Sequence, residues 1–200
     1  AKLSANGTLT LSAPLTTFGT GVIDLTANMD MDAHGDLTQA EGADVNSAGG
    51  AINMTIGNGV LGGGNMYLRY VNAQAGEIVL TVSEGSISSA QNSVPTLICG
   101  SIDMRGPPVG ASAIGTSQNP IHIEANYLQA TAGSGGISIY AEKDLTITNI
   151  RTSGDFFVVG ASGTRPGDQP VAPTKANHVK EFVTCYFQRN VSSLKASAFT

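Results

Sequence analysis

The residues Gly50-Ala-Ile-Asn-Met-Thr-Ile56 show a simple pattern, in which a glycine is followed by alternating apolar and polar side chains. Such alternation is typical of a β-strand with one buried face. Units of the same kind begin at Gly7, Gly21, Gly35 and Gly64, so the starting glycines from 7 to 64 are spaced 14, 14, 15 and 14 residues apart. This spacing indicates an internal repeat of short strands.

The repeat predicts an all-β fold, a right-handed parallel β-helix. The unit returns with the same phase each time, as expected where every strand stacks on the equivalent strand of a neighbouring coil. Glycines would lie at corners that need a positive φ or a close backbone approach. An antiparallel sandwich has similar strand spacing and is the alternative. A proline-containing loop is expected from Pro107 to Pro120, and the predicted strands are 7–12, 21–26, 35–38, 50–56, 64–70, 76–82, 85–88, 100–104, 121–124, 136–140, 144–148 and 154–159.

The composition supports an all-β fold and disfavours helical, nucleic-acid-binding and membrane-spanning proteins. The 200 residues include 25 Gly and no Trp, and only 12% are charged, which is too few to solvate the outer faces of soluble helices. The net charge of −5 gives no basic surface, so we expect no nucleic-acid partner. No apolar run is long enough for a membrane span. Residues 1–7 lack the apolar core of a signal peptide, so any export signal is expected to be cleaved or to lie outside this sequence.

Three segments are expected along the chain. Residues 1–163 form the β-helix body, and residues 164–175, which are rich in Pro and Gly, form a linker. Residues 176–200 form an atypical C-terminal tail, which concentrates aromatic residues that the repeats lack. Because an open end of a parallel stack exposes strand edges, the tail is predicted either to cap the last coil or to join the next subunit. The aromatic residues of this interaction segment are Phe182, Tyr186 and Phe187.

A longer motif, IGTSQNPIHIEANYLQATAGSGGISIY, runs from Ile114 to Tyr140 and is followed by Asp144-Leu-Thr-Ile147. Ala33-His-Gly-Asp-Leu-Thr-Gln39 and Ser47-Ala-Gly-Gly-Ala-Ile-Asn-Met-Thr55 share parts of its pattern. In these stretches the chain resembles the repeating coils of filamentous-haemagglutinin-like exoproteins, which are large secreted bacterial adhesins. The resemblance implies a right-handed parallel β-helix displayed outside the cell.

The resemblance also implies a function class. We expect a secreted cell-surface protein with no enzymatic activity and no cofactor, which serves as a structural subunit of an extracellular filament or as an adhesin. Its expected partners are copies of itself or the surface of a host or neighbouring cell, glycans included. A polysaccharide-binding or polysaccharide-cleaving β-helix protein is the alternative. Sugar stacking would require exposed aromatic side chains, for which the candidates are Tyr67, Tyr70, Tyr127 and Tyr140.

The densest acidic run is a candidate calcium site. Asn28, Asp30 and Asp32 alternate with Met and would share one face of a strand, where their oxygen atoms suit a hard cation. However, Ala33 stands where an EF-hand loop has Gly, and Gln39 stands where it has a bidentate Glu. A solvated outer face is therefore the main interpretation, and calcium binding is the alternative.

The histidines and cysteines give weaker indications of a metal site or a disulfide. His34, His122 and His178 do not have the spacing of a zinc site, and His122 is expected on the solvated outer surface, because it lies between two isoleucines that would point inwards. In an exported protein Cys99 and Cys185 would form a disulfide that joins the tail to the body. Two buried thiols or a bridge between subunits are the alternatives.

Overall fold

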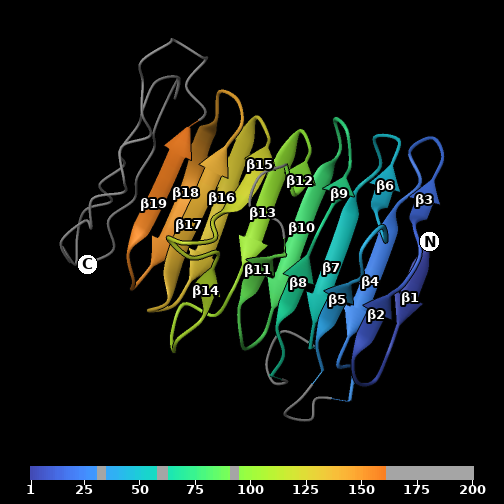
Figure 1. Cartoon of the computed structure of the whole chain (residues 1–200), viewed down its shortest axis with the longest axis horizontal. Coiled ribbons are helices and arrows are strands. Elements are labelled where there is room, and N and C mark those ends of the chain that lie inside the picture. Colours follow the sequence, from blue (N-terminus) through green and yellow to red (C-terminus); the bar gives the residue numbers. More distant parts are fainter. Residues whose placement is uncertain (31–34, 58–62, 91–94, 161–200) are drawn as a thin grey trace.

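The computed structural model describes residues 1–30, 35–57, 63–90 and 95–160. Over these residues the chain forms an all-β solenoid of about five turns, and its sheets are all parallel. Figure 1 shows the coils stacked side by side, from β1 near the N-terminus to β19 at the other end. The predicted parallel β-helix is therefore confirmed, and the sandwich is excluded for the part of the chain that the structure describes.

Each complete coil contributes one strand to each of three faces. The first face is a 7-stranded sheet that consists of β1 (Lys2–Ser4), β4 (Ile23–Ala27), β7 (Ile52–Ile56), β10 (Glu77–Val82), β13 (Ser101–Arg105), β16 (Tyr127–Ala132) and β18 (Thr146–Thr152). The second face consists of β2 (Leu9–Leu11), β5 (Leu37–Gln39), β8 (Met66–Leu68), β11 (Ile87–Ser89) and β14 (Ala113–Ile114). The third face consists of β3 (Leu15–Thr17), β6 (Val45–Ser47), β9 (Val71–Asn72), β12 (Leu97–Ile98) and β15 (Ile121–Glu124).

The second and third faces merge at β17 (Gly136–Ala141). The first part of β17 pairs with β14, and its last residues pair with β15. The final strand, β19 (Phe156–Gly160), pairs with β17 over its whole length. The solenoid therefore changes from three strands per coil to two near its C-terminal end.

The sequence interval of about 14 residues corresponds to half a coil. Asp24 of β4 pairs with Asn53 of β7, which lies two such intervals further along the chain. The glycine-led units supply strands of the first and second faces, whereas β3, β6 and β9 of the third face lie between them and were not predicted. The structure also places β14 inside the loop expected from Pro107 to Pro120, and it adds β16, which the sequence analysis did not contain.

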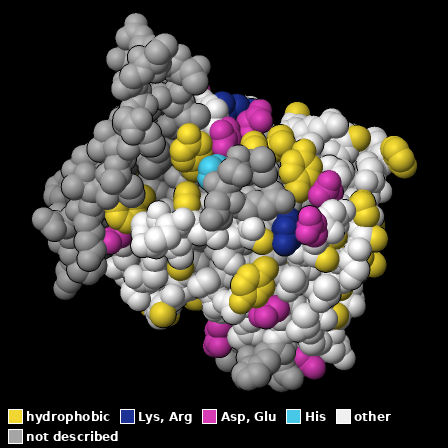
Figure 2. Space-filling view, in the orientation of Figure 1, with side chains coloured by type: hydrophobic (Ala, Val, Ile, Leu, Met, Phe, Trp, Pro, Cys, Tyr) yellow, Lys and Arg dark blue, Asp and Glu magenta, His cyan; other side chains and the backbone are white. Residues whose placement is uncertain are grey.

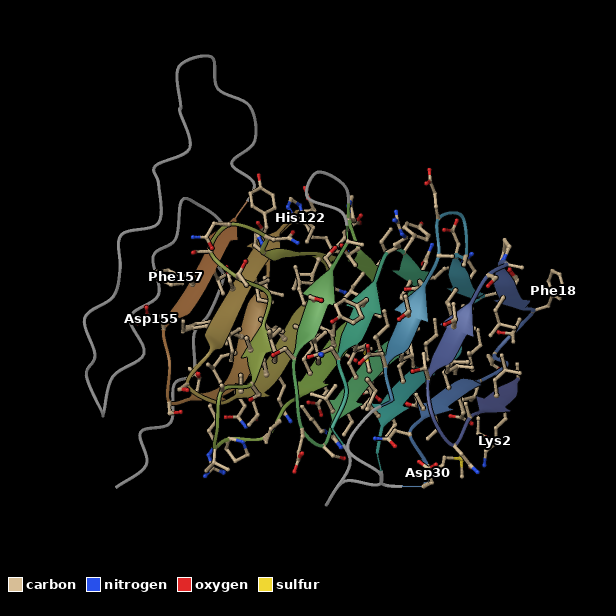
Figure 3. All side chains as sticks on the ribbon, turned by 60° about the horizontal axis from the view of Figure 1, so that its bottom comes forward. Lys2, Phe18, Asp30, His122, Asp155 and Phe157 are labelled. Carbon is tan, nitrogen blue, oxygen red and sulfur yellow. The ribbon has the colours of Figure 1, made fainter. Side chains whose placement is uncertain are left out.

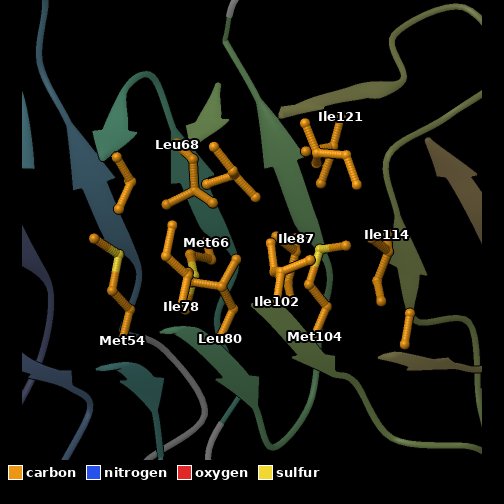
Figure 4. Packing of buried hydrophobic residues seen from close by; sticks show 14 of the residues in the cluster. Met54, Met66, Leu68, Ile78, Leu80, Ile87, Ile102, Met104, Ile114 and Ile121 are labelled. Carbon is orange, nitrogen blue, oxygen red and sulfur yellow. The ribbon is translucent and has the colours of Figure 1, made fainter. Parts of the chain in front are cut away.

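The interior of the solenoid is filled by columns of equivalent apolar side chains. Ile52, Ile78 and Ile102 are neighbours in register along the first face, and each is at most 2% exposed. A parallel column contains Met54 and Leu80, which are fully buried. Figure 4 shows Met54, Ile78, Leu80 and Ile102 packed together with Met66 and Ile87 of the second face. Burial of these continuous columns is the main stabilising contribution of the fold.

Glycines occupy corners where the backbones of successive coils meet, as predicted. A Cβ atom at Gly50 would overlap the carbonyl oxygen of Gly21 in the preceding coil. Gly85 has a φ of 97° and lies in the same way against the carbonyl of Gly64. These corners admit only a residue without a side chain.

Candidate functional site

The outer side of the first face carries two columns of mostly polar side chains. One column runs through Asp24, Asn53, Val79, Asp103, Gln129 and Asn149. The adjacent column runs through Thr26, Thr55, Thr81, Arg105, Thr131 and Arg151. Asn53 donates a hydrogen bond of 2.7 Å from Nδ2 to Oδ1 of Asp24. The columns present hydroxyl, amide and charged groups at the regular spacing of a parallel sheet.

Asp103 is the most buried charged group of this surface, and its side chain is 10% exposed. Its Oδ2 accepts hydrogen bonds from Nε of Arg105 at 2.8 Å, from Nη2 of the same guanidinium and from Nε2 of Gln129 at 3.2 Å. Its Oδ1 is buried and has no hydrogen-bond partner among the described residues. The hydrogen bond and the negative charge of Asp103 raise the pKa of Arg105. The side chain of Arg105 is nevertheless 56% exposed.

A groove of about 680 Å³ begins where Arg105 ends β13. The turn that follows β10, at Ser83, Glu84 and Gly85, lines one side, and residues 106–112 line the other. Its volume lies in the range of small-molecule sites. Val109 projects from the second wall with 73% of its surface exposed. The groove combines an apolar wall with charged and hydroxyl groups.

The tyrosines proposed for sugar stacking differ in exposure. Tyr127 on the first face is 53% exposed, and Tyr67 on the second face is 39% exposed. Tyr70 and Tyr140 are of intermediate exposure, and Tyr140 points outwards as predicted, because Ile137 and Ile139 are buried. Tyr127 pairs with Ser101, two residues before Asp103 along β13, so Tyr127 and Asp103 lie on the same outer surface.

The prediction of a solvated His122 was wrong. Ile121 and Ile123 do point inwards, but His122 is only 7% exposed. Its ring stacks on Tyr140 with centroids 4.5 Å apart, and its Nδ1 lies 2.8 Å from Oε1 of Glu142. The neighbouring strand β17 and the residue that follows it therefore cover the imidazole, although it lies outside the apolar interior. Figure 3 shows the position of His122 on the solenoid.

The calcium candidate does not have the geometry expected from alternation. β4 ends at Ala27, and Asn28 adopts a positive φ of 56° and is fully buried. Its Nδ2 donates a hydrogen bond of 2.8 Å to the carbonyl oxygen of Gly63. The side chain of Asn28 therefore stabilises a backbone corner of the next coil. Asp30 is exposed, and Asp32 lies outside the described residues. Within the ranges 1–30, 35–57, 63–90 and 95–160, no group of three or more His, Cys, Asp or Glu side chains is placed to hold a metal ion.

Gln39 has a structural role that the sequence analysis did not recognise. Its Nε2 donates hydrogen bonds of 2.8 and 3.0 Å to the carbonyl oxygens of Ala43 and Tyr70. Its Oε1 accepts a hydrogen bond of 3.0 Å from the backbone amide of Arg69. The side chain is 2% exposed and links two successive coils from the interior.

The predictions for the C-terminal segments stay predictions. The linker and the tail residues Phe182, Tyr186 and Phe187 lie outside the described residues, as does Cys185. Cys99 is a core residue that is 1% exposed, and burial raises the pKa of its thiol to about 12. An intramolecular or intersubunit disulfide of Cys99 is therefore untested.

Comparisons with protein-family models, with curated proteins and with solved structures gave no match for this chain. The resemblance to filamentous-haemagglutinin-like proteins is thus supported at the level of a parallel β-solenoid with repeated coils. None of the described segments is a helix with the length and hydropathy needed to cross a membrane.

Proposed function

We propose that the chain is a secreted, non-enzymatic surface protein whose stacked coils form a structural unit of an extracellular fibre or adhesin. The fold is compatible with such a role, because a parallel solenoid is stiff along its axis and grows by adding equivalent coils. A surface of few charges with rows of Thr and Asn suits a rod whose copies can associate without strong electrostatic repulsion. Figure 2 shows that charged side chains are sparse on the face in view.

The observation that carries this proposal is the open edge of the described stack at β1, β2 and β3. Leu3 of β1 is 40% exposed, whereas Leu25, its partner in the next coil, is 1% exposed. Phe18 and Val22 nearby are 89% and 43% exposed. Among the described residues, β1, β2 and β3 each pair with a single neighbouring strand. Figure 3 shows Lys2 and Phe18 at this end and Phe157 at the opposite end.

These features suit the addition of a further coil, whether from residues that precede Ala1 in a longer chain or from a second copy, and the proposal takes the second copy as the source. An unpaired parallel edge offers backbone donors and acceptors to an incoming strand, and the exposed apolar side chains would become buried on pairing. The contact between the two copies, here called the joint, would repeat the strand pairing that connects β4 to β1 within the chain. The tail aromatics predicted for the joint would supply further apolar surface.

The experiment measures particle size against protein concentration by light scattering, with electron microscopy of the same samples. We expect rods longer than one chain, and we expect the double variant Leu3→Glu, Val22→Glu to reduce them to single chains, because it places charge in the joint. Tyr67→Ser is the matched control, since Tyr67 is equally exposed but lies away from the end. A chain that stays monomeric at high concentration, or a double variant that assembles normally, would contradict the proposal.

A separate assay on the same samples tests the proposed lack of enzymatic activity. Incubation with acidic polysaccharides is expected to release no shorter products. Cleavage that is lost in Asp30→Ala would instead identify a carbohydrate-active enzyme on the β-helix.

A further inference from the structure

We infer that the groove between the turn at Ser83–Gly85 and the loop 106–112 binds a neutral sugar, as part of a neutral polysaccharide or oligosaccharide. The inference deepens the attachment role proposed above and rests on it, because it names the class of ligand that the lateral surface would hold. The groove lies on the side of the solenoid, far from the stacking end at Leu3 in coil order.

The shape and lining of the groove suit a sugar ring. Its volume of about 680 Å³ accommodates a small ligand, and its lining mixes apolar and polar groups, as sites for such ligands do. Pro107, Pro108 and Val109 form the apolar wall, against which the C–H face of a pyranose ring can pack. Thr81 supplies a hydroxyl group from the opposite side, where the hydroxyl of the neighbouring Ser83 donates a hydrogen bond of 3.0 Å to the carbonyl oxygen of Ile56.

Arg105 lines the groove, and its partner Asp103 lies next to it on β13, outside the lining; together they supply the polar recognition. A carboxylate beside a guanidinium places an acceptor next to a donor, and two neighbouring sugar hydroxyls, each a donor and an acceptor, match that arrangement. Oδ2 of Asp103 is fully used, whereas its buried Oδ1 has no partner among the described residues. An unpaired buried acceptor is unfavourable, so a hydroxyl that reaches it gains a strong hydrogen bond.

The charge balance favours a neutral ligand over an acidic one. The charged residues that line the groove are Glu84 and Arg105, and Asp103 already neutralises Arg105. The remaining charge is therefore the negative charge of Glu84, and the whole chain has a net charge of −5. A sulfated or uronic polysaccharide would meet repulsion here.

The surface can accommodate more than one ring. Tyr127 pairs with Ser101, and Arg105 lies four residues further along the same strand, a distance of about 13 Å at the rise of a parallel strand. The exposed ring of Tyr127 offers a stacking surface for a second sugar unit at the end distant from the groove. The site thus fits an extended chain that runs along β13.

The test uses isothermal titration calorimetry on the full-length Leu3→Glu, Val22→Glu variant, whose stacking is blocked. The probes are maltohexaose, cellohexaose and mannohexaose, with hexagalacturonate as the acidic counterpart. We expect at least one neutral hexasaccharide to bind at least tenfold more tightly than hexagalacturonate. Val109→Asp and Arg105→Gln are each expected to weaken that binding at least tenfold, and Tyr127→Ala to weaken it less.

Two controls separate loss of the site from loss of the fold. Ala13→Asp introduces the same charge at an exposed turn remote from the groove and should bind as the parent does. Val109 is itself largely exposed, so Val109→Asp should unfold at the same denaturant concentration as the parent. Absence of binding to all neutral probes, preference for the acidic probe, or unchanged binding by Val109→Asp would each overturn the inference. Because binding is measured on unstacked chains, its failure is distinguishable from failure of the fibre proposal, which concerns particle length alone.

Discussion

At the scale of single residues, Gly50 shows how closely the coils approach each other. Its α-carbon faces the carbonyl oxygen of Gly21, and a methyl group there would overlap that oxygen. The backbones on both sides are fixed by sheet pairing, so neither can move away without breaking hydrogen bonds between coils. Glycine is therefore required here for space between coils, and Gly50→Ala tests that requirement.

We predict that Gly50→Ala lowers the free energy of unfolding by about 2 kcal/mol or more, because overpacking strains two coils at once. Gly7→Ala is the matched control, since nothing lies within 4 Å of a Cβ atom at Gly7. That change should alter the free energy of unfolding by about 1 kcal/mol at most. Urea denaturation followed by far-ultraviolet circular dichroism measures both, and equal effects at the two positions would refute the close-approach argument.

Other residue-scale properties depend on neighbours that are distant in the sequence. The outward direction of His122 follows from alternation, but its burial depends on Tyr140 and Glu142, which come from the following coil. Alternation likewise failed at Asn28, where the backbone turns to positive φ and the side chain reaches Gly63. Local pattern predicts which side of a strand a residue lies on, whereas partners across coils decide its surroundings.

At the scale of elements, Gln39 joins β5 to the corner that leads into β6 and to the coil that follows. Its amide side chain hydrogen-bonds three backbone groups, the carbonyls of Ala43 and Tyr70 and the amide of Arg69, and of these the carbonyl of Tyr70 has a second donor in the amide of Val45. Its neighbours in the same inward row are apolar, and Leu11 is its partner in the preceding coil. An apolar replacement would suit those neighbours but would remove the hydrogen bonds that Gln39 makes to the carbonyl of Ala43 and the amide of Arg69, whereas the carbonyl of Tyr70 would still accept a hydrogen bond from the amide of Val45.

We predict that Gln39→Leu destabilises the chain by about 2 to 3 kcal/mol even though it makes an interior position more apolar, because buried backbone groups lose their partners. Thr38→Val is the control on the same strand, since Thr38 faces outwards and is half-buried. It should change stability by about 0.5 kcal/mol at most. Thermal and urea denaturation of the two variants compares them directly, and a Gln39→Leu protein as stable as the parent would show that the corner holds without the amide.

The strands that could be predicted from the sequence and those that were missed differ in the sequence patterns that mark them. Strands such as β7 and β8 begin shortly after glycines that the coil geometry requires, so their positions were recognisable. The missed strands β9 and β14 have only two residues each and begin without a glycine. So short a segment shows no alternation, and its conformation is set by pairing with the coils on either side. The groove of the candidate site has the same origin, since its two walls come from successive coils.

At the scale of the whole molecule, each coil contacts mainly its immediate neighbours, so stability is expected to vary along the axis. Strands β7, β10 and β13 have a coil on each side, and their inward residues are almost fully buried. The first coil has a described neighbour on one side only, and Leu3 and Leu15 keep part of their surface exposed. In a nearly one-dimensional stack such an end coil opens at lower free energy than the interior coils.

We predict that backbone amides of β1, β2 and β3 exchange with deuterium roughly 100-fold faster than those of β7, β10 and β13 in dilute protein. The difference should shrink as concentration rises, because a second copy that pairs with the first coil protects the same amides. The Leu3→Glu, Val22→Glu variant should keep the fast exchange at every concentration, while Tyr67→Ser should follow the parent. Hydrogen exchange measured by mass spectrometry on peptides from each coil provides the comparison. Uniform protection along the solenoid in dilute protein would mean that the end coil is held by something other than its single pairing with β4, β5 and β6, and the stacking joint would then have to lie elsewhere.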